Sequence, residues 1–453
     1  MRVPRLEREL GIEVYASRSL GIGGRIRQFS EDFVVEEVLV DGSKARTSPV
    51  EPQPLVGEGR YLVCVLVKRD WDTLLSVKEV ARRLGVGHKR IQIAGIKDAK
   101  ALTAQHVSLR GVAPERVQRV RIKDITLYPL RFCDEAVFPH LLFGNQFHIV
   151  IRAISHRSSG IEQRVKGVQS ELSNLGGFPN FFGHQRFGTI RPITHLVGSS
   201  LVKGDPEKAA LTFLAQPSPH EHPESREARQ RLLDTRDFQE AARGFPRHLR
   251  YERWMLSHLA KRPRDFVGAF RRLPKKLRRL FIQAYQSFLF NRFLSQRIQR
   301  GIPLKEAQIG DYALSLDDYG LPTTQFTQVT AQSIQGVEKA LTEGRMRVAV
   351  PLIGFKQPPS DGIQGEIERE TLESEGVSPR DFRVSFMPEI SASGGLRTTL
   401  ASMIHLYVEG ASSDSVNSSK RKVGLSFTLH RGSYATILLR EFMKPRDLIK
   451  AGF

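Results

Sequence analysis

The sequence predicts an α+β fold, in which a mixed or antiparallel sheet with flanking helices is interrupted by a long inserted domain. Short segments rich in β-branched residues fill the first third of the chain and return near its end, whereas the middle is helical and basic. The length of 453 residues is also about three times the ~150 residues typical of one domain. We therefore expect residues 1–175 and 386–453 to form one discontinuous domain and residues 176–385 to form the insertion.

Five segments are predicted strands because they are short, rich in β-branched residues and bounded by turn residues. They span residues 32–40, 60–68, 106–111, 146–153 and 422–429. Since the last of these resembles the first four in character, we expect it to belong with them in the same domain.

Four helices are predicted from apolar residues that recur at three- and four-residue steps. They span residues 74–84, 158–175, 277–298 and 434–442. Gly85 and Gly176 follow the first two, as glycine often follows a helix, and Pro274 precedes the third. Ser433 precedes the fourth and is a candidate N-cap.

The charge of the chain favours a polyanionic partner. Lys and Arg number 69 against 48 Asp and Glu, a net charge of +21. Thirteen of these cations lie between Arg243 and Arg279, with only Glu252 and Asp265 among them. A run of charge can be a solvated helix face, but its concentration in an already basic chain favours contact with RNA or DNA.

Several classes of protein are disfavoured. The two cysteines, Cys64 and Cys133, can build neither a disulfide framework nor a zinc site, so we expect no metal and a reducing, cytoplasmic setting. Charged residues interrupt the first ten positions, and no apolar run approaches the ~18 residues of a membrane span. We expect no membrane contact. The oligomeric state cannot be read from the sequence, and we expect a monomer.

The segment AGIKDAKALTAQ at residues 94–105 is the first candidate for chemistry. It places Asp98 between Lys97 and Lys100 in a turn that begins with glycine. A carboxylate among cations is expected to carry its charge, which suits a nucleophile or a general base. The alternative is an ordinary aspartate in a solvated turn.

Two further segments combine aromatic and polar residues. PNFFGHQRFG at residues 179–188 could stack bases and contact phosphate, or its three phenylalanines could fill an interface between domains. GNQF at residues 144–147 precedes a predicted strand, so core packing is the default for Phe147.

Six segments together resemble the TruD family of pseudouridine synthases, in the order of that family and from Gly21 to the C terminus. They are SEDFVVEE at 30–37, AGIKDAKALTAQ at 94–105, GNQF at 144–147, NFFGHQRFG at 180–188, AYQSFLFN at 284–291 and RGSYATILLRE at 431–441. Six segments in order are more specific than any single motif. The long basic insertion is similar to that of archaeal members.

The resemblance implies an isomerase that converts uridine to pseudouridine in tRNA, usually at uridine 13, without a cofactor. It also implies a pseudouridine synthase core that is split by an inserted α/β domain particular to TruD. Asp98 matches the catalytic aspartate of the GxKD motif. Whether this carboxylate attacks the sugar, attacks the base or removes a ribose proton is left open.

The resemblance assigns substrate-binding roles to residues around Asp98. Arg27 stands where many members carry a lysine that pairs with the aspartate, and arginine keeps the charge but cannot deprotonate. Asn145 and Phe147 match the NxF motif. Asn145 is expected to orient Asp98 or a ribose hydroxyl, and Phe147 to stack on the uracil.

Other residues are expected to support substrate binding. Ser433, near a predicted helix N-terminus, could hold a phosphate. The remaining assigned residues are Lys97, Asn180, Phe181, Gln185 and Arg186.

Two alternative functions belong to other classes. One is a non-catalytic RNA-binding protein that retains the fold, although it would have no need for the intact motif around Asp98. The other is a tRNA methyltransferase, for which the sequence offers no cofactor loop.

Overall fold

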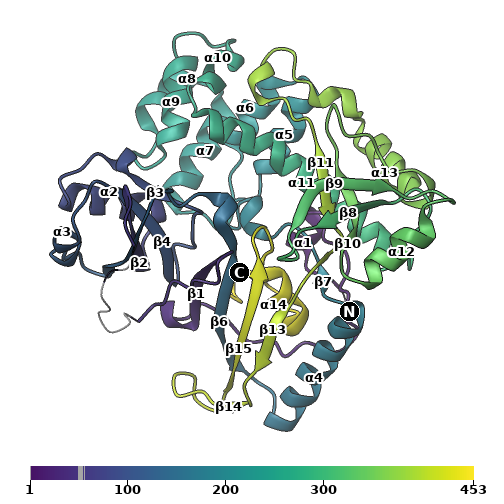
Figure 1. The fold of residues 1–453 in the computed structure, drawn as a ribbon. Coiled ribbons are helices and arrows are strands. Elements are labelled where there is room, and N and C mark those ends of the chain that lie inside the picture. Colours follow the sequence, from purple (N-terminus) through teal and green to yellow (C-terminus); the bar gives the residue numbers. More distant parts are fainter. Residues whose placement is uncertain (1, 49–54, 56) are drawn as a thin grey trace. The chain divides into compact units, whose positions relative to one another are not determined.

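The computed structural model describes residues 2–48, 55 and 57–453, and the chain divides into two compact units (Figure 1). Unit 1 comprises Met1–Ala16, Pro179–Leu400 and Phe453. Unit 2 comprises Ser17–Phe178 and Ala401–Gly452. The chain leaves unit 2 through β7 (Phe178–Pro179) and returns to it through β12 (Leu400–Ala401).

The unit boundaries differ from those expected at residues 175 and 385. The N-terminal segment, with α1 (Arg5–Glu9), belongs to unit 1 because α11 (Lys275–Gln299) holds it. Asn291 donates a hydrogen bond to the Leu10 carbonyl (3.0 Å), and Ser295 donates one to the Gly11 carbonyl (2.7 Å). Residues 386–400 also stay in unit 1, since β11 (Gly395–Thr398) completes its sheet.

Unit 2 is built on a mixed nine-stranded sheet, which confirms the α+β prediction for this part of the chain. Its main path runs β13-β15-β6-β1-β4-β2-β5, with β14 paired to β15 and β3 to β4. All the pairs along this path are antiparallel except β1 with β4. The strands are β1 (Phe33–Leu39), β2 (Tyr61–Arg69), β3 (Ile91–Ile93), β4 (Leu102–Arg110), β5 (Ile125–Cys133), β6 (Leu142–Ile154), β13 (Ile404–Val408), β14 (Ser412–Ser413) and β15 (Arg421–His430).

The five predicted strands correspond to β1, β2, β4, β6 and β15. The sequence analysis missed β5, β13 and β14. The alternation of β1 puts Phe33, Val35, Glu37 and Leu39 on its buried face, so this strand presents three apolar side chains and one carboxylate to the interior.

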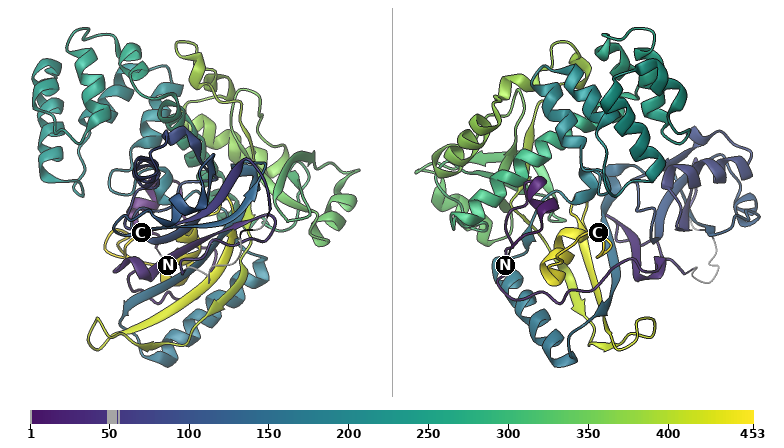
Figure 2. Two further views of the ribbon diagram at one scale, coloured as in Figure 1. Left: turned by 60° about the vertical axis from the view of Figure 1, so that its left-hand side comes forward. Right: turned by 180° about the vertical axis from the view of Figure 1, so that it is seen from behind.

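In the described part of unit 2, the helices beside the sheet are α2 (Thr73–Arg83), α3 (Pro114–Gln118), α4 (Ser158–Leu175) and α14 (Ala435–Met443). Asp72 caps α2 by accepting hydrogen bonds from the backbone of Leu74 and Leu75. The apolar face of α2 packs on the core side of β2. The predicted bounds of α4 are confirmed, and Gly176 ends it with φ of 82°. Figure 2 shows α4 lying alongside the sheet, where it packs against α14.

Unit 1 combines helices with a four-stranded antiparallel sheet in the order β11-β10-β8-β9. The sheet contains β8 (Tyr312–Leu316), β9 (Pro322–Gln328) and β10 (Met346–Leu352). Besides α1, the helices of unit 1 that precede α11 are α5 (Thr194–Val202), α6 (Pro206–Ala215), α7 (Pro223–Thr235), α8 (Phe238–Gly244), α9 (Arg250–Leu259) and α10 (Phe266–Arg271). Two more follow it, α12 (Ile334–Thr342) and α13 (Gly362–Glu375).

The predicted long helix at residues 277–298 is α11, whose N-cap is Pro274. Its buried face includes Phe281, Tyr285 and Phe290, so this helix is the core of unit 1. In the described residues no helix is long and apolar enough to cross a membrane.

Candidate active site

Asp98 lies in the loop between β3 and β4, and side chains from two neighbouring elements hold this loop. Thr73, at the start of α2, accepts a hydrogen bond from the Lys97 backbone N–H (3.0 Å) and donates one to the Lys97 carbonyl (3.2 Å). Gln105 of β4 donates to the Gly95 carbonyl (3.1 Å). The loop backbone is therefore anchored at Gly95 and Lys97, just before Asp98.

The Asp98 side chain reaches solvent and faces a buried arginine. It is 38% exposed, and its Oδ1 lies 3.5 Å from Nη2 of Arg27, whose side chain is only 11% exposed. Burial lowers the pKa of the Arg27 guanidinium, while the charge of Asp98 opposes that shift. An arginine stays charged under such conditions, so it provides a fixed positive charge beside the carboxylate.

Several contacts fix the position of Arg27. Its backbone adopts a left-handed φ of 55°, which is uncommon for a residue with a side chain. Its Nη1 donates a hydrogen bond to the Gly452 carbonyl (3.0 Å), and its guanidinium lies 4.0 Å from the centre of the Phe33 ring. The arginine therefore reaches Asp98 from a fixed position.

Lys97 points away from solvent into a buried charged cluster. Its Nζ lies 2.6 Å from Oε2 of Glu37 and donates to Oδ1 of Asn145 at 2.7 Å. Glu37 also accepts a hydrogen bond from the backbone N–H of His106 (3.0 Å). Burial would raise the pKa of Glu37, but hydrogen bonding to His106 and the charge of Lys97 outweigh it and lower that pKa. This buried ion pair joins the Asp98 loop to β1 and β6.

A second buried lysine holds the backbone of Asp98 itself. Lys68 of β2 is fully buried, and its Nζ donates a hydrogen bond of 2.6 Å to the Asp98 carbonyl. Burial lowers the pKa of Lys68 to about 8, although the charges of Asp98, Asp72 and Asp70 oppose the shift. A charge-assisted bond to this carbonyl restricts where the Asp98 side chain can lie.

Phe147 lies on β6, two residues from Asn145, so both side chains share one face of the sheet. Its ring stacks on that of Phe427 (centroids 5.3 Å apart) and meets Phe33 edge-on at 6.2 Å. Only 6% of Phe147 is exposed. The ring thus packs in an aromatic cluster beside the charged one, as the core interpretation expects.

Ser433 lies in the turn between β15 and α14, but it does not cap that helix. The N-cap is Tyr434, in extended conformation, and no side chain caps the helix there. The predicted N-cap at Ser433 is wrong because the helix begins one residue later than expected, at Ala435.

The segment at residues 180–188 lies in unit 1. Asn180 is buried, donates to Oγ1 of Thr398 (2.9 Å) and accepts from Arg397 (2.6 Å). Phe181 is fully buried, so it offers no face for a base in this conformation, and packing explains it better than stacking. Gln185 is exposed. Arg186 is partly buried and donates to Oγ of Ser287 on α11 (3.2 Å).

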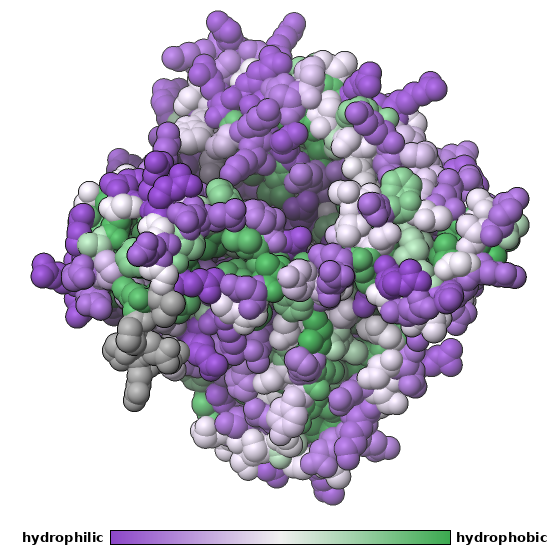
Figure 3. Space-filling model, in the orientation of Figure 1, coloured by the Kyte–Doolittle hydropathy of each residue, from purple (hydrophilic) through white to green (hydrophobic). Residues whose placement is uncertain are grey.

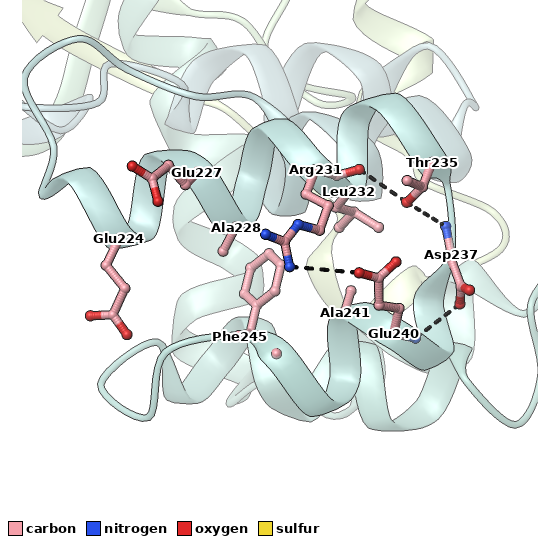
Figure 4. A pocket seen from close by; sticks show the side chains of 11 residues that line it. Glu224, Glu227, Ala228, Arg231, Leu232, Thr235, Asp237, Glu240, Ala241 and Phe245 are labelled. Carbon is pink, nitrogen blue, oxygen red and sulfur yellow. Dashed lines mark hydrogen bonds and ion pairs between the residues drawn. The ribbon is translucent and has the colours of Figure 1, made fainter.

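A pocket of about 150 Å³ in unit 1 contains none of the predicted site residues (Figure 4). It lies between α7 and α8 and is lined by the carboxylates of Glu224, Glu227, Asp237 and Glu240. Arg231 pairs with Glu240 at 3.6 Å across it. This predominantly acidic lining is unfavourable for a phosphate.

Sequence reasoning missed two residues that support the candidate site, Glu37 and Lys68. Each is a charged residue on a strand face whose other members are apolar. That pattern was the available signal, because a buried charge needs a specific partner. Among the described residues, no group of three His, Cys, Asp or Glu side chains is placed to hold a metal ion.

Comparison with known proteins supports the resemblance in the sequence. Residues 9–442 match the family model of tRNA pseudouridine synthase D (TruD). A protein of Methanosarcina mazei named "Probable tRNA pseudouridine synthase D" is 40% identical over 449 residues, which cover 99% of each chain. One of the same name from Methanopyrus kandleri is 41% identical over 403 residues, 89% of this chain and 90% of that protein.

A solved structure extends this similarity to the fold. The crystal structure of a TruD protein of Methanosarcina mazei matches with a TM-score of 0.83 at 39% identity, over 98% of this chain and 99% of that one. The match confirms the predicted fold class, a pseudouridine synthase core with an inserted domain.

Proposed function

The chain belongs to the TruD family of tRNA pseudouridine synthases, and on this premise we propose that it isomerises uridine 13 of tRNA to pseudouridine, with Asp98 as the catalytic carboxylate. One observation carries the assignment of Asp98. It is a partly exposed carboxylate beside a fixed arginine, whereas the neighbouring Glu37 is buried and paired.

The reaction needs the target uridine outside the base stack, because its glycosidic bond is otherwise inaccessible. The C1′–N1 bond breaks, the uracil rotates, and C5 bonds to C1′. The hydrogen on C5 leaves as a proton and N1 gains one, so the reaction is an isomerisation with no oxidant or reductant. Asp98 assists by acting on the ribose or the base of the flipped nucleotide.

The surrounding residues of unit 2 prepare Asp98 for this role. Arg27 places a positive charge beside the carboxylate, and Lys68 fixes the backbone of Asp98. Asn145, held by Lys97, orients Asp98 or a ribose hydroxyl, and Phe147 contributes an apolar surface below the target uracil. Ser433 contacts the RNA backbone from the turn before α14.

Unit 1 supplies affinity for tRNA in this proposal. Of the thirteen cations between Arg243 and Arg279, eleven are exposed. Such a surface can replace the counterions of an RNA backbone. Gln185 and Arg186 supply further polar contacts, whereas Asn180 and Phe181 support their segment from within.

The position of the modified uridine can be tested with a pair of tRNA transcripts that differ only at nucleotide 13, uridine in one and cytidine in the other. The protein is incubated with each and no cofactor, and pseudouridine is located by carbodiimide labelling and primer extension. A single new stop at position 13 of the uridine transcript is expected. Modification elsewhere would overturn the assignment of uridine 13, and tight binding without product would favour the non-catalytic RNA-binding protein.

A further inference from the structure

Helix α9 in unit 1 exposes two large aromatic side chains on a basic face. Trp254 is 40% exposed and Tyr251 is 43% exposed, and their rings meet edge-on with centroids 5.4 Å apart. The guanidinium of Arg250 lies 5.5 Å from the centre of the Trp254 ring. The three residues thus form a preassembled cluster on the surface, which we call the α9 platform.

The same face of the helix carries no carboxylate. Arg250, Trp254, Ser257 and Lys261 recur at steps of three and four residues and are all exposed. All residues of α9 are described, and Glu252 is the only acidic one among them. It is buried on another side of the helix, where it pairs with Arg229 at 2.7 Å. The platform therefore combines aromatic faces with positive charge alone.

The neighbouring surface extends this charge. Arg247 lies just before α9, and Lys261, Arg262 and Arg264 follow it, all exposed. Asp265, the remaining acid of the basic stretch, pairs with His258 at 2.8 Å. In Figure 3 hydrophilic side chains project from this part of unit 1, at the top of the view.

We propose that the α9 platform binds an unpaired nucleotide of the tRNA, whose base stacks on Trp254 and Tyr251 while Arg250 and Lys261 contact the flanking phosphates. Stacking on an aromatic side chain with cations beside it is how proteins hold unpaired bases. A base within a duplex has no free face, so the platform selects a loop or an end of the tRNA. This inference rests on the proposed function, since it assumes that tRNA is the ligand.

The chain allows a direct optical test because it has only two tryptophans, Trp71 and Trp254. In a Trp71→Phe background Trp254 is the sole source of tryptophan fluorescence. We expect an unmodified tRNA transcript to quench this fluorescence and to protect it from acrylamide. A blunt RNA duplex of similar length should bind through its phosphates without the same quenching.

A binding measurement gives a second readout. The double variant Tyr251→Leu/Trp254→Leu should bind tRNA about tenfold more weakly than wild type. The matched control is Tyr319→Leu, which removes a 52% exposed tyrosine in the acidic turn between β8 and β9. The control should bind like wild type.

Three outcomes would overturn the platform, and they differ in what they say of the proposed function. Tight tRNA binding with unchanged Trp254 fluorescence and unchanged affinity of the double variant would reject the platform alone. Absence of tRNA binding to the wild-type chain would reject the proposed function as well. If the emission of Trp254 changes with protein concentration in the absence of RNA, this face binds a second copy of the chain instead of a nucleotide.

Discussion

Cations have different surroundings in the two units. In unit 2, Lys68, Lys97 and Arg27 are buried or nearly so, and each has specific partners around Asp98. In unit 1, the cations of the stretch from Arg243 to Arg279 are mostly exposed. Buried charges must be paired and therefore fix geometry, whereas exposed charges remain available to a polyanion. Changes in unit 2 should alter the rate, and changes in unit 1 should alter affinity.

Among substitutions of these cations, the largest effect is expected at Lys68. Lys68→Met removes the ammonium that holds the Asp98 carbonyl, and the loop can then move by a fraction of an ångström. We expect the single-turnover rate to fall by about 10- to 100-fold, because small displacements of a catalytic group are costly. The Kd for tRNA should stay within about twofold of wild type. A large loss of affinity with an unchanged rate would remove the distinction between the units.

A smaller loss of rate is expected at Arg27. Arg27→Gln removes the positive charge 3.5 Å from Asp98 but keeps a side chain that can donate hydrogen bonds. The rate should fall by about tenfold, since one charge interaction near a partly exposed group is lost. Arg27→Lys, which retains the charge, is the control and should recover part of the rate. If both variants have the same rate, the charge of Arg27 is not what matters.

In unit 1 the expected effect is on affinity. Lys275→Gln/Lys276→Gln removes two exposed cations at the start of α11. The slope of log Kd against log salt should decrease by about 1.5, because each lost phosphate contact lowers it by about 0.7 to 0.9. Lys305→Gln/Lys339→Gln removes two exposed lysines outside the basic stretch and is the matched control. Equal slopes for the two double variants would place Lys275 and Lys276 away from the RNA.

The smallest effect concerns the pH dependence of stability. The folded-state pKa of Lys68 is about 8, below the ordinary value of 10.5. Between these pH values the unfolded chain binds more protons at this residue, so the free energy of unfolding rises with pH. Below pH 8 the Lys68 ammonium stays charged in the folded chain, so its burial lowers the free energy of unfolding by the full amount. In urea unfolding, the free energy of unfolding of wild type should increase by about 1 kcal/mol between pH 7.5 and 9.5, relative to that of Lys68→Met. A constant difference would mean that Lys68 does not titrate in this range.

Regular elements with strong patterns were predictable from the sequence. The helix α4 and the strand β15 show clear periodicity and definite ends, and both lie where they were expected. The resemblance implied an α/β insertion, but the strands of the four-stranded sheet of unit 1 could not be located from the sequence. Strands such as β9 are largely exposed and carry no apolar alternation. The assignment of residues 2–16 to unit 1 was also not predictable, since it depends on hydrogen bonds to α11 across more than 280 residues.

The motifs of the candidate site could be identified from the sequence, but the buried residues that hold them in place could not. Asp98 stood out by its setting between two lysines, yet nothing local indicated that Lys97 turns inward to Glu37. Phe181 was expected at the substrate but is fully buried, because NFFGHQRFG packs two of its phenylalanines out of solvent completely. Spacing along the chain identifies chemical types, whereas long-range packing decides which side chains reach solvent.

The most direct test of the catalytic assignment is tritium release from tRNA labelled at uridine C5, with wild type and Asp98→Ala compared side by side and no added cofactor. We predict that wild type releases tritium and that Asp98→Ala is slower by about 10³-fold or more, while binding tRNA almost as tightly. Release by Asp98→Ala at a rate near that of wild type would contradict the role of Asp98. No release by wild type, despite binding of the tRNA, would contradict the proposed isomerisation of this substrate.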